Sequence, residues 1–135
     1  MRKILISMTV LAVLAAAGAA CGQDADTFQA KYSAVLSQLQ SMGHGYYSTE
    51  EWAQIDQSIQ ELMADAARRD DGNAIVQAAV IKAMVLGDMR RRNAEAVDVL
   101  VAARKKVAKM DGIDASKLYV KQAEVEAEAG NAAAV

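Results

Sequence analysis

The feature that most constrains the fold is a nearly unbroken apolar stretch in the middle of the chain, from Ala74 to Leu86. It reads AIVQAAVIKAMVL, and only Gln77 and Lys82 in it are polar. A helix that is apolar on nearly every face must be covered on several sides. The stretch is too short to cross a bilayer as a helix. We therefore expect a buried helix in the middle of a small helical domain, with the other helices packed around it.

The composition agrees with a small helical protein. The chain has 135 residues, no proline and a single cysteine, and aromatic residues make up only 4% of it. This length fits one domain with one hydrophobic core of ordinary size. Because one cysteine cannot form a disulfide within the chain, the domain must be stable without one. The sequence predicts an all-α fold, either a small antiparallel helical bundle or a helical-hairpin stack, of about five helices.

Apolar spacing and capping signals place the predicted helices. Stripes at steps of three and four residues predict helices over residues 24–41, 49–71, 73–92, 93–110 and 115–129. Ser48 and Glu51 have the spacing of a capping box at the start of the second helix. Asn73 is predicted to cap the central helix, and Gly130 to close the last one. Gly87 speaks against an unbroken central helix.

The first twenty residues have the layout of a bacterial secretory signal. Arg2 and Lys3 precede a charge-free run from Ile4 to Ala20, which ends in small residues. In such a signal the positive end stays on the cytoplasmic side, and the small residues fit the peptidase pocket. We predict a signal segment over residues 1–20, followed by a single helical domain over residues 21–135. The protein is then exported and resides in the periplasm or on the membrane.

The single cysteine decides between these two locations. Gly18 to Cys21 reads GAAC and resembles the lipobox of bacterial lipoproteins, although leucine is usual where Gly18 stands. The resemblance implies that Cys21 is lipidated and anchors the protein to a membrane. Alternatively, Ala20 to Gly22 forms a small-x-small cleavage site, so that the mature chain begins at Gln23 without the cysteine. A third alternative is a signal that is retained as an uncleaved anchor.

Two parts of the helical domain resemble fragments of the tetratricopeptide pattern. The small-residue spacings from Ala96 to Ala103 and from Ala123 to Gly130 are similar to those of this family. The constant repeat length of tetratricopeptide arrays is not held between them. The resemblance implies stacked helical hairpins and no more specific function.

No residue pattern indicates catalysis, a metal site or a cofactor. The only histidine, His44, lies between two glycines and has no predicted partner. No cysteine and histidine cluster has metal-ligand spacing, and no glycine-rich loop leads from a strand into a helix. The chain has 15 basic and 17 acidic residues, which is not the balance of a nucleic-acid-binding protein. We predict a protein that is not an enzyme and holds no cofactor.

Two surfaces are candidates for contact with a partner. His44, Tyr46 and Tyr47 lie in the loop before the second helix, and tyrosine combines apolar area with a hydroxyl group. Lys105 and Lys106 belong to a basic cluster at the end of the fourth helix, where exposed charge would speed encounters with an acidic partner. The alternatives are simple loop packing for the tyrosines and compensation of the helix dipole for the lysines.

These observations favour one function and leave an alternative. The favoured one is an exported, non-enzymatic helical scaffold or interaction protein of the bacterial cell envelope, whose partner is another envelope protein. The alternative is a small-ligand carrier or sensor that uses the loop region 43–52. A cavity rimmed by Tyr46, Tyr47 and Trp52 would favour the carrier, and an exposed apolar groove over a filled core would favour the scaffold.

Overall fold

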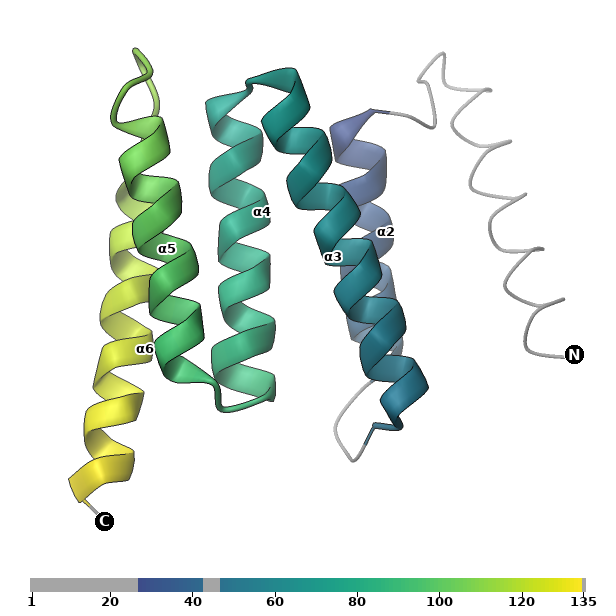
Figure 1. Cartoon of the computed structure of the whole chain (residues 1–135), viewed down its shortest axis with the longest axis vertical. Helices are drawn as coiled ribbons and strands as arrows, with labels where there is room; N and C mark the ends of the chain where they lie inside the picture. Colours follow the sequence, from purple (N-terminus) through teal and green to yellow (C-terminus); the bar gives the residue numbers. More distant parts are fainter. Residues whose placement is uncertain (1–26, 43–46, 135) are drawn as a thin grey trace, which may run out of the picture.

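The computed structural model describes residues 27–42 and 47–134, and over these ranges the protein is entirely helical, without strands (Figure 1). The elements are α2 (Phe28–Met42), α3 (Thr49–Arg69), α4 (Gly72–Met84), a π-helical segment η1 (Val85–Met89), α5 (Asn93–Val107) and α6 (Ser116–Ala134). Consecutive α-helices run antiparallel and lie side by side. The predicted all-α fold is confirmed. The predicted start of the first helix, at Asp24, lies outside the described residues.

α4 is the central element of the fold. It packs against α3, α5 and α6, and a hydrogen bond of 3.2 Å from Gln29 to Gln77 connects it to α2. Its buried residues are Gly72, Ala74, Ile75, Val76, Ala78, Ala79, Ile81 and Ala83. The spacing between packed helices depends on the side chains at the contact, so the small alanines let several neighbours approach. The apolar stretch thus lies where its composition predicts.

The apolar stripes predicted for the flanking helices also face the core. The buried residues are Phe28 and Val35 from α2, Ile55, Ile59, Leu62 and Ala66 from α3, Ala96, Leu100, Ala103 and Val107 from α5, and Leu118 and Val125 from α6. Full burial of a valine, leucine, isoleucine or phenylalanine side chain stabilises the folded state by about 1.5–3 kcal/mol. Packing of these faces, rather than intrinsic helix propensity, therefore stabilises the helices.

The helix caps are partly as predicted. At the start of α3, the Ser48 hydroxyl accepts from the Glu51 backbone N–H (3.1 Å), and the Glu51 carboxylate accepts from the Ser48 N–H (3.4 Å). This confirms the capping box. The prediction that Asn73 caps α4 is wrong. Asp71 is the cap, and its carboxylate accepts from the N–H groups of Asn73 (3.1 Å) and Ala74 (3.3 Å).

The tight turn between α3 and α4 explains this shift. Asp70 adopts the left-handed conformation (φ 52°), so the chain reverses at once and α4 begins earlier than the sequence suggests. Gly72 then lies against the loop between α5 and α6. A Cβ at this position would stand 2.5 Å from Cγ1 of Ile113, so only glycine fits without displacing the isoleucine. Gly72 therefore marks a close approach as well as a helix start.

The central helix changes its winding near Gly87. After Met84 it continues as the π-helical segment η1, and the chain turns sharply at Arg91 (φ 60°). Gly87 is buried near Ala96 of α5 and Val125 of α6. The predicted interruption at Gly87 is thus present, as one π turn. Such single turns in α-helices occur frequently at functional sites.

The last helix does not end at Gly130, contrary to the prediction. α6 continues through it to Ala134. Nothing lies within 4 Å of a Cβ built on Gly130, so no contact forces the chain to turn there. A glycine inside an exposed helix costs only about 1 kcal/mol relative to alanine, and the next residues include three alanines, the best helix formers.

Candidate functional site

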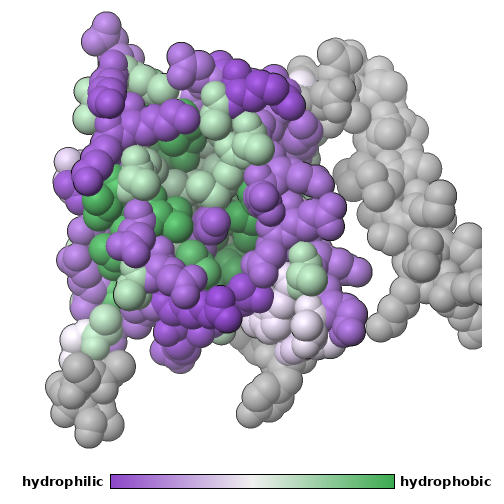
Figure 2. All heavy atoms as spheres, viewed as in Figure 1, coloured by the Kyte–Doolittle hydropathy of each residue, from purple (hydrophilic) through white to green (hydrophobic). Residues whose placement is uncertain are grey.

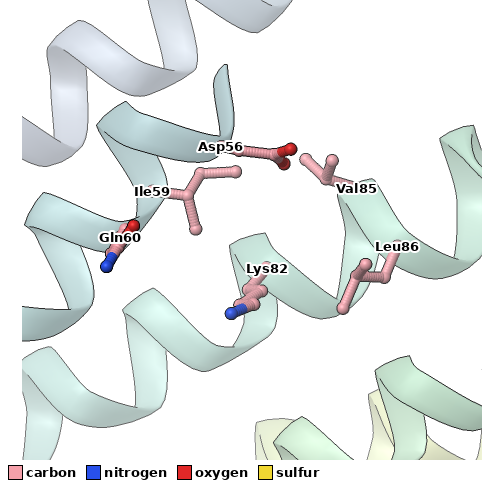
Figure 3. A pocket seen from close by; sticks show the side chains of 6 residues that line it. All are labelled: Asp56, Ile59, Gln60, Lys82, Val85 and Leu86. Atoms are coloured by element: carbon pink, nitrogen blue, oxygen red, sulfur yellow. The ribbon is translucent and has the colours of Figure 1, made fainter. Parts of the chain in front are cut away.

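An apolar hollow lies over α4, on the side where α3 and α5 flank it. Figure 2 shows hydrophobic surface gathered over α4 and the adjoining sides of α3 and α5, with hydrophilic residues around it. α3 and α5 hardly contact each other, so α4 forms the floor between them. A cavity of about 240 Å³ opens here between α3 and the end of the central helix (Figure 3). We call this cavity the α3–α4 hollow. Its lining residues are Asp56, Ile59, Gln60, Lys82, Val85 and Leu86.

The floor of the α3–α4 hollow carries one charged side chain, Lys82. Figure 3 shows it on α4, with Ile59 of α3 on one side and Leu86 of the next turn on the other. Lys82 is half-buried, and within the described part of the chain no ion pair or hydrogen bond involves its ammonium group. The hollow thus offers apolar walls together with one positive charge that the protein itself does not neutralise.

The rim of the hollow is fixed by a cluster of aromatic and charged residues. Nη1 of Arg90 donates to both carboxylate oxygens of Asp56, at 3.0 and 3.1 Å. The same guanidinium lies 4.2 Å from the ring centroid of Trp52, in cation–π geometry. Tyr47 packs edge-on against Trp52, with ring centroids 5.0 Å apart. These contacts tie the end of η1 to the start of α3 and hold Asp56 at the edge of the hollow.

The predicted contact residues fall into three groups. His44, Tyr46 and the predicted lipid-attachment residue Cys21 lie outside the described residues. Tyr47 is half-buried against Trp52 at the start of α3. Lys105 and Lys106 are exposed in the last turn of α5, at the opposite end of the molecule (Figure 1).

The structure therefore does not join Tyr47 and the two lysines in one surface. Neither the α3–α4 hollow nor the second cavity of the described residues, between α4 and α6, is lined by Tyr47 or Trp52. The ligand site in the loop region 43–52 stays a prediction, since residues 43–46 lie outside the described residues.

A second hollow lies between α4 and α6. Its volume is larger, about 380 Å³, and its lining residues are Val80, Met84, Ser116, Lys117, Val120, Lys121 and Glu124. Nζ of Lys121 donates to Asp88 (2.8 Å) and Glu124 (3.3 Å). Burial by itself would lower the pKa of Lys121, but the hydrogen bonds and charges of the two carboxylates raise it above its usual range. The charge of Lys121 in this hollow is thus already neutralised within the protein.

One buried carboxylate was missed by the sequence analysis. Asp65 of α3 is only 2% exposed, and it accepts from Nζ of Lys31 (3.1 Å), from Nε of Arg69 (2.7 Å) and from Arg68. The hydrogen bond from Arg69 lowers the pKa of Asp65, burial opposes this, and Lys31 adds to the lowering. The signal in the sequence was an acidic residue on the apolar stripe of α3, three residues after Leu62.

The described residues hold no other arrangement with evident chemistry. Their aspartate and glutamate side chains form no group that could bind a metal ion. None of the described helices is long and apolar enough to cross a membrane. No protein-family model matches the chain, and neither curated proteins nor solved structures are significantly similar to it. The α3–α4 hollow is therefore the candidate site on which a function can be argued.

Proposed function

We propose that this chain is an exported, non-enzymatic helical interaction protein of the bacterial cell envelope, and that a helix of another envelope protein docks over its α3–α4 hollow. The observation that carries this proposal is the hydrophobic surface that Figure 2 shows over α4 and the adjoining sides of α3 and α5. Apolar surface framed by polar residues is typical of protein interaction sites.

The dimensions of the hollow favour a protein partner over a small ligand. Pockets for drug-sized ligands usually enclose about 300–1,000 Å³, whereas the cavity here measures about 240 Å³. That volume suits one or two side chains of a larger partner. A helix that lies between α3 and α5 would place its apolar face on α4, which is the helix-in-groove mode of recognition.

The location in the envelope rests on the N-terminal sequence. Arg2, Lys3 and the apolar run to Ala20 support export, and Cys21 supports attachment to a membrane by a lipid. Cleavage before Gln23 would instead release the protein into the periplasm. In both cases the helical domain meets other envelope proteins, and its acidic balance makes nucleic acid an unsuitable partner.

Site-specific crosslinking in the producing bacterium tests the proposal. A photo-reactive residue in place of Gln60, which lines the hollow, should give one discrete product with an envelope protein. The matched control is the same replacement at Gln54, an exposed residue of α3 that lines neither hollow. The captured protein, once purified, should bind the chain, and Gln60→Trp should block that binding.

Two results would contradict the proposal. Equal products from Gln60 and Gln54 would mean that the hollow is not the docking surface. Full-length protein that retains Met1 and stays soluble in the cytoplasm would contradict export. Intact-mass analysis of the membrane and soluble fractions also separates lipidation of Cys21 from cleavage before Gln23.

A further inference from the structure

We infer that the helix bound in the α3–α4 hollow carries an aspartate or glutamate within its apolar stripe, and that this carboxylate pairs with Lys82. The inference rests on the proposed function, because it specifies the partner of the same surface. It follows from a comparison of Lys82 with the other half-buried basic residues.

Every half-buried basic side chain of the described residues except Lys82 has a partner within the chain. Lys31 pairs with Asp65, and Lys121 pairs with Asp88 and Glu124. The remaining two combine a hydrogen bond with an aromatic ring: Arg90 with Asp56 and Trp52, and Arg104 with Gln122 and Tyr119. Among these five, Lys82 alone has neither a hydrogen bond nor an aromatic ring against its charged group.

The one carboxylate that lines the hollow is already paired with another residue. Asp56 lines the same cavity, but both of its carboxylate oxygens accept from Nη1 of Arg90. The stacking of Arg90 on Trp52 holds that arrangement in place. The other lining residues, Ile59, Gln60, Val85 and Leu86, carry no charge. The positive charge of the hollow therefore remains available to an incoming group.

Desolvation selects the partner. An unoccupied hollow lets the Lys82 ammonium reach water while its methylene stem lies along apolar surface. A wholly apolar helix placed over it would bury the ammonium without compensation, and burial of an unpaired charge is strongly unfavourable. A carboxylate brought by the helix removes this penalty and sets the register of binding. The hollow should thus accept an acidic amphipathic helix and reject a basic one.

Peptide selection tests this inference with a defined probe. Amphipathic helical peptides with an apolar stripe, randomised at one central stripe position, are displayed on phage and selected against the full chain. Against the wild type, aspartate and glutamate should dominate that position. Against Lys82→Met, which keeps an unbranched apolar stem, apolar residues should replace them, and against Lys82→Glu, lysine and arginine should. Melting curves verify that each variant is folded.

The affinities of the selected peptides then measure how strongly the carboxylate contributes to binding. The selected glutamate peptide should bind the wild type about tenfold more tightly than its glutamine counterpart, and this ratio should fall to about twofold or less on Lys82→Met. The matched control is Lys109→Met, which changes an exposed lysine that lines neither hollow. It should leave the tenfold ratio unchanged.

The outcomes separate the inference from the proposed function. Peptides that bind and are blocked by Gln60→Trp, but show no acidic preference or keep it on Lys82→Met, would overturn the pairing with Lys82 and leave the docking surface intact. If no peptide is selected, or if Gln60→Trp does not block those that are, the hollow is not a helix-binding surface and the proposed function fails with it.

Discussion

The Lys31 ammonium of α2 lies 3.1 Å from the Asp65 carboxylate of α3, so a nearly buried acid joins the first hairpin of the fold. The side chain of Lys31 is 33% exposed, whereas Asp65 is 2% exposed. Arg69 and Arg68 complete the surroundings of the carboxylate from its own helix. The arrangement neutralises Asp65 and at the same time ties α2 to α3.

Asp65→Asn should make the protein less stable at neutral pH, by about 1–2 kcal/mol. The charged partners are partly exposed, so water screens much of their attraction. The folded-state pKa of Asp65 lies below its ordinary value of 3.8, so its contribution is complete above about pH 4 and is lost as pH falls through the lower folded-state pKa. The stability difference between wild type and variant should therefore shrink below pH 4. Denaturant titrations from pH 7 to pH 2.5 measure it.

The matched control is Asp98→Asn. Asp98 is an exposed residue of α5, and no ion pair within the described part of the chain involves it. Its replacement should change stability little. A difference between wild type and Asp65→Asn that stays constant down to pH 2.5 would mean that the Asp65 charge does not stabilise the fold.

Alanine should have opposite effects at two helical glycines. Gly72→Ala places a Cβ 2.5 Å from Cγ1 of Ile113 and should cost about 1–3 kcal/mol through overpacking. Gly130→Ala meets nothing within 4 Å and should stabilise α6 by about 0.5–1 kcal/mol. Adding Ile113→Ala to Gly72→Ala should relieve the clash, so the double variant should be less destabilised than the two single losses predict. Additive losses in thermal unfolding would mean that the two residues do not press on each other.

Truncation in the central helix tests the position of α4. Ile81 is 3% exposed, and Ile81→Ala should cost about 2–5 kcal/mol through lost burial and the cavity left behind. Val120 of α6 is 58% exposed, so Val120→Ala should change stability by no more than about 0.5 kcal/mol. Chemical denaturation of both variants measures the contrast. Similar losses for the two would show that α4 is not enclosed.

Charge reversal at the end of α5 distinguishes the contribution of this basic cluster to binding from that of the docking surface. Lys105 and Lys106 are exposed, so replacing both with glutamate should leave the fold intact. Association with the partner captured at Gln60 should become slower, most clearly at low salt, while dissociation stays nearly unchanged. Stopped-flow association at two salt concentrations measures this. If binding is untouched here while Tyr46→Ala and Tyr47→Ala abolish it, the loop is the working surface instead.

The parts of the fold that the sequence predicted depend on local patterns. The enclosure of Ala74–Leu86 follows from its lack of a polar face, and the capping box follows from the spacing of Ser48 and Glu51. Each of these two features depends only on residues that are close together in the sequence. They do not require knowledge of which helices become neighbours.

The predictions that went wrong depend on contacts distant in sequence or on competing local effects. Asn73 has a residue type that commonly caps helices, but the left-handed conformation of Asp70 starts α4 earlier, so that Asp71 is the cap. Gly130 was expected to stop a helix, but nothing in the structure turns the chain there. No local pattern indicates the contacts of Arg90 with Asp56 and Trp52 on α3, because these residues are far apart in the sequence.

The α3–α4 hollow could not be predicted because it depends on how α3 lies against α4 and η1. Ile59 belongs to the core stripe, and Lys82 appeared only as a polar exception in an apolar run. Their proximity, and the absence of a partner for Lys82 among the described residues, emerge only when α3 is placed beside α4.

Because of the π turn of η1, the rim of the α3–α4 hollow depends on the number of residues in this segment as well as on its side chains. A π turn accommodates one residue more than an α turn, and one residue corresponds to about 100° of rotation in a helix. Arg90 faces Asp56 and Trp52 because the segment Val85–Met89 is wound in this way. A deletion of a single residue there would let the helix continue in regular α form and would swing the guanidinium away from its partners. Relatives of this protein that differ by one residue in this segment would then present a different rim to their partners, even with every side chain of the hollow retained.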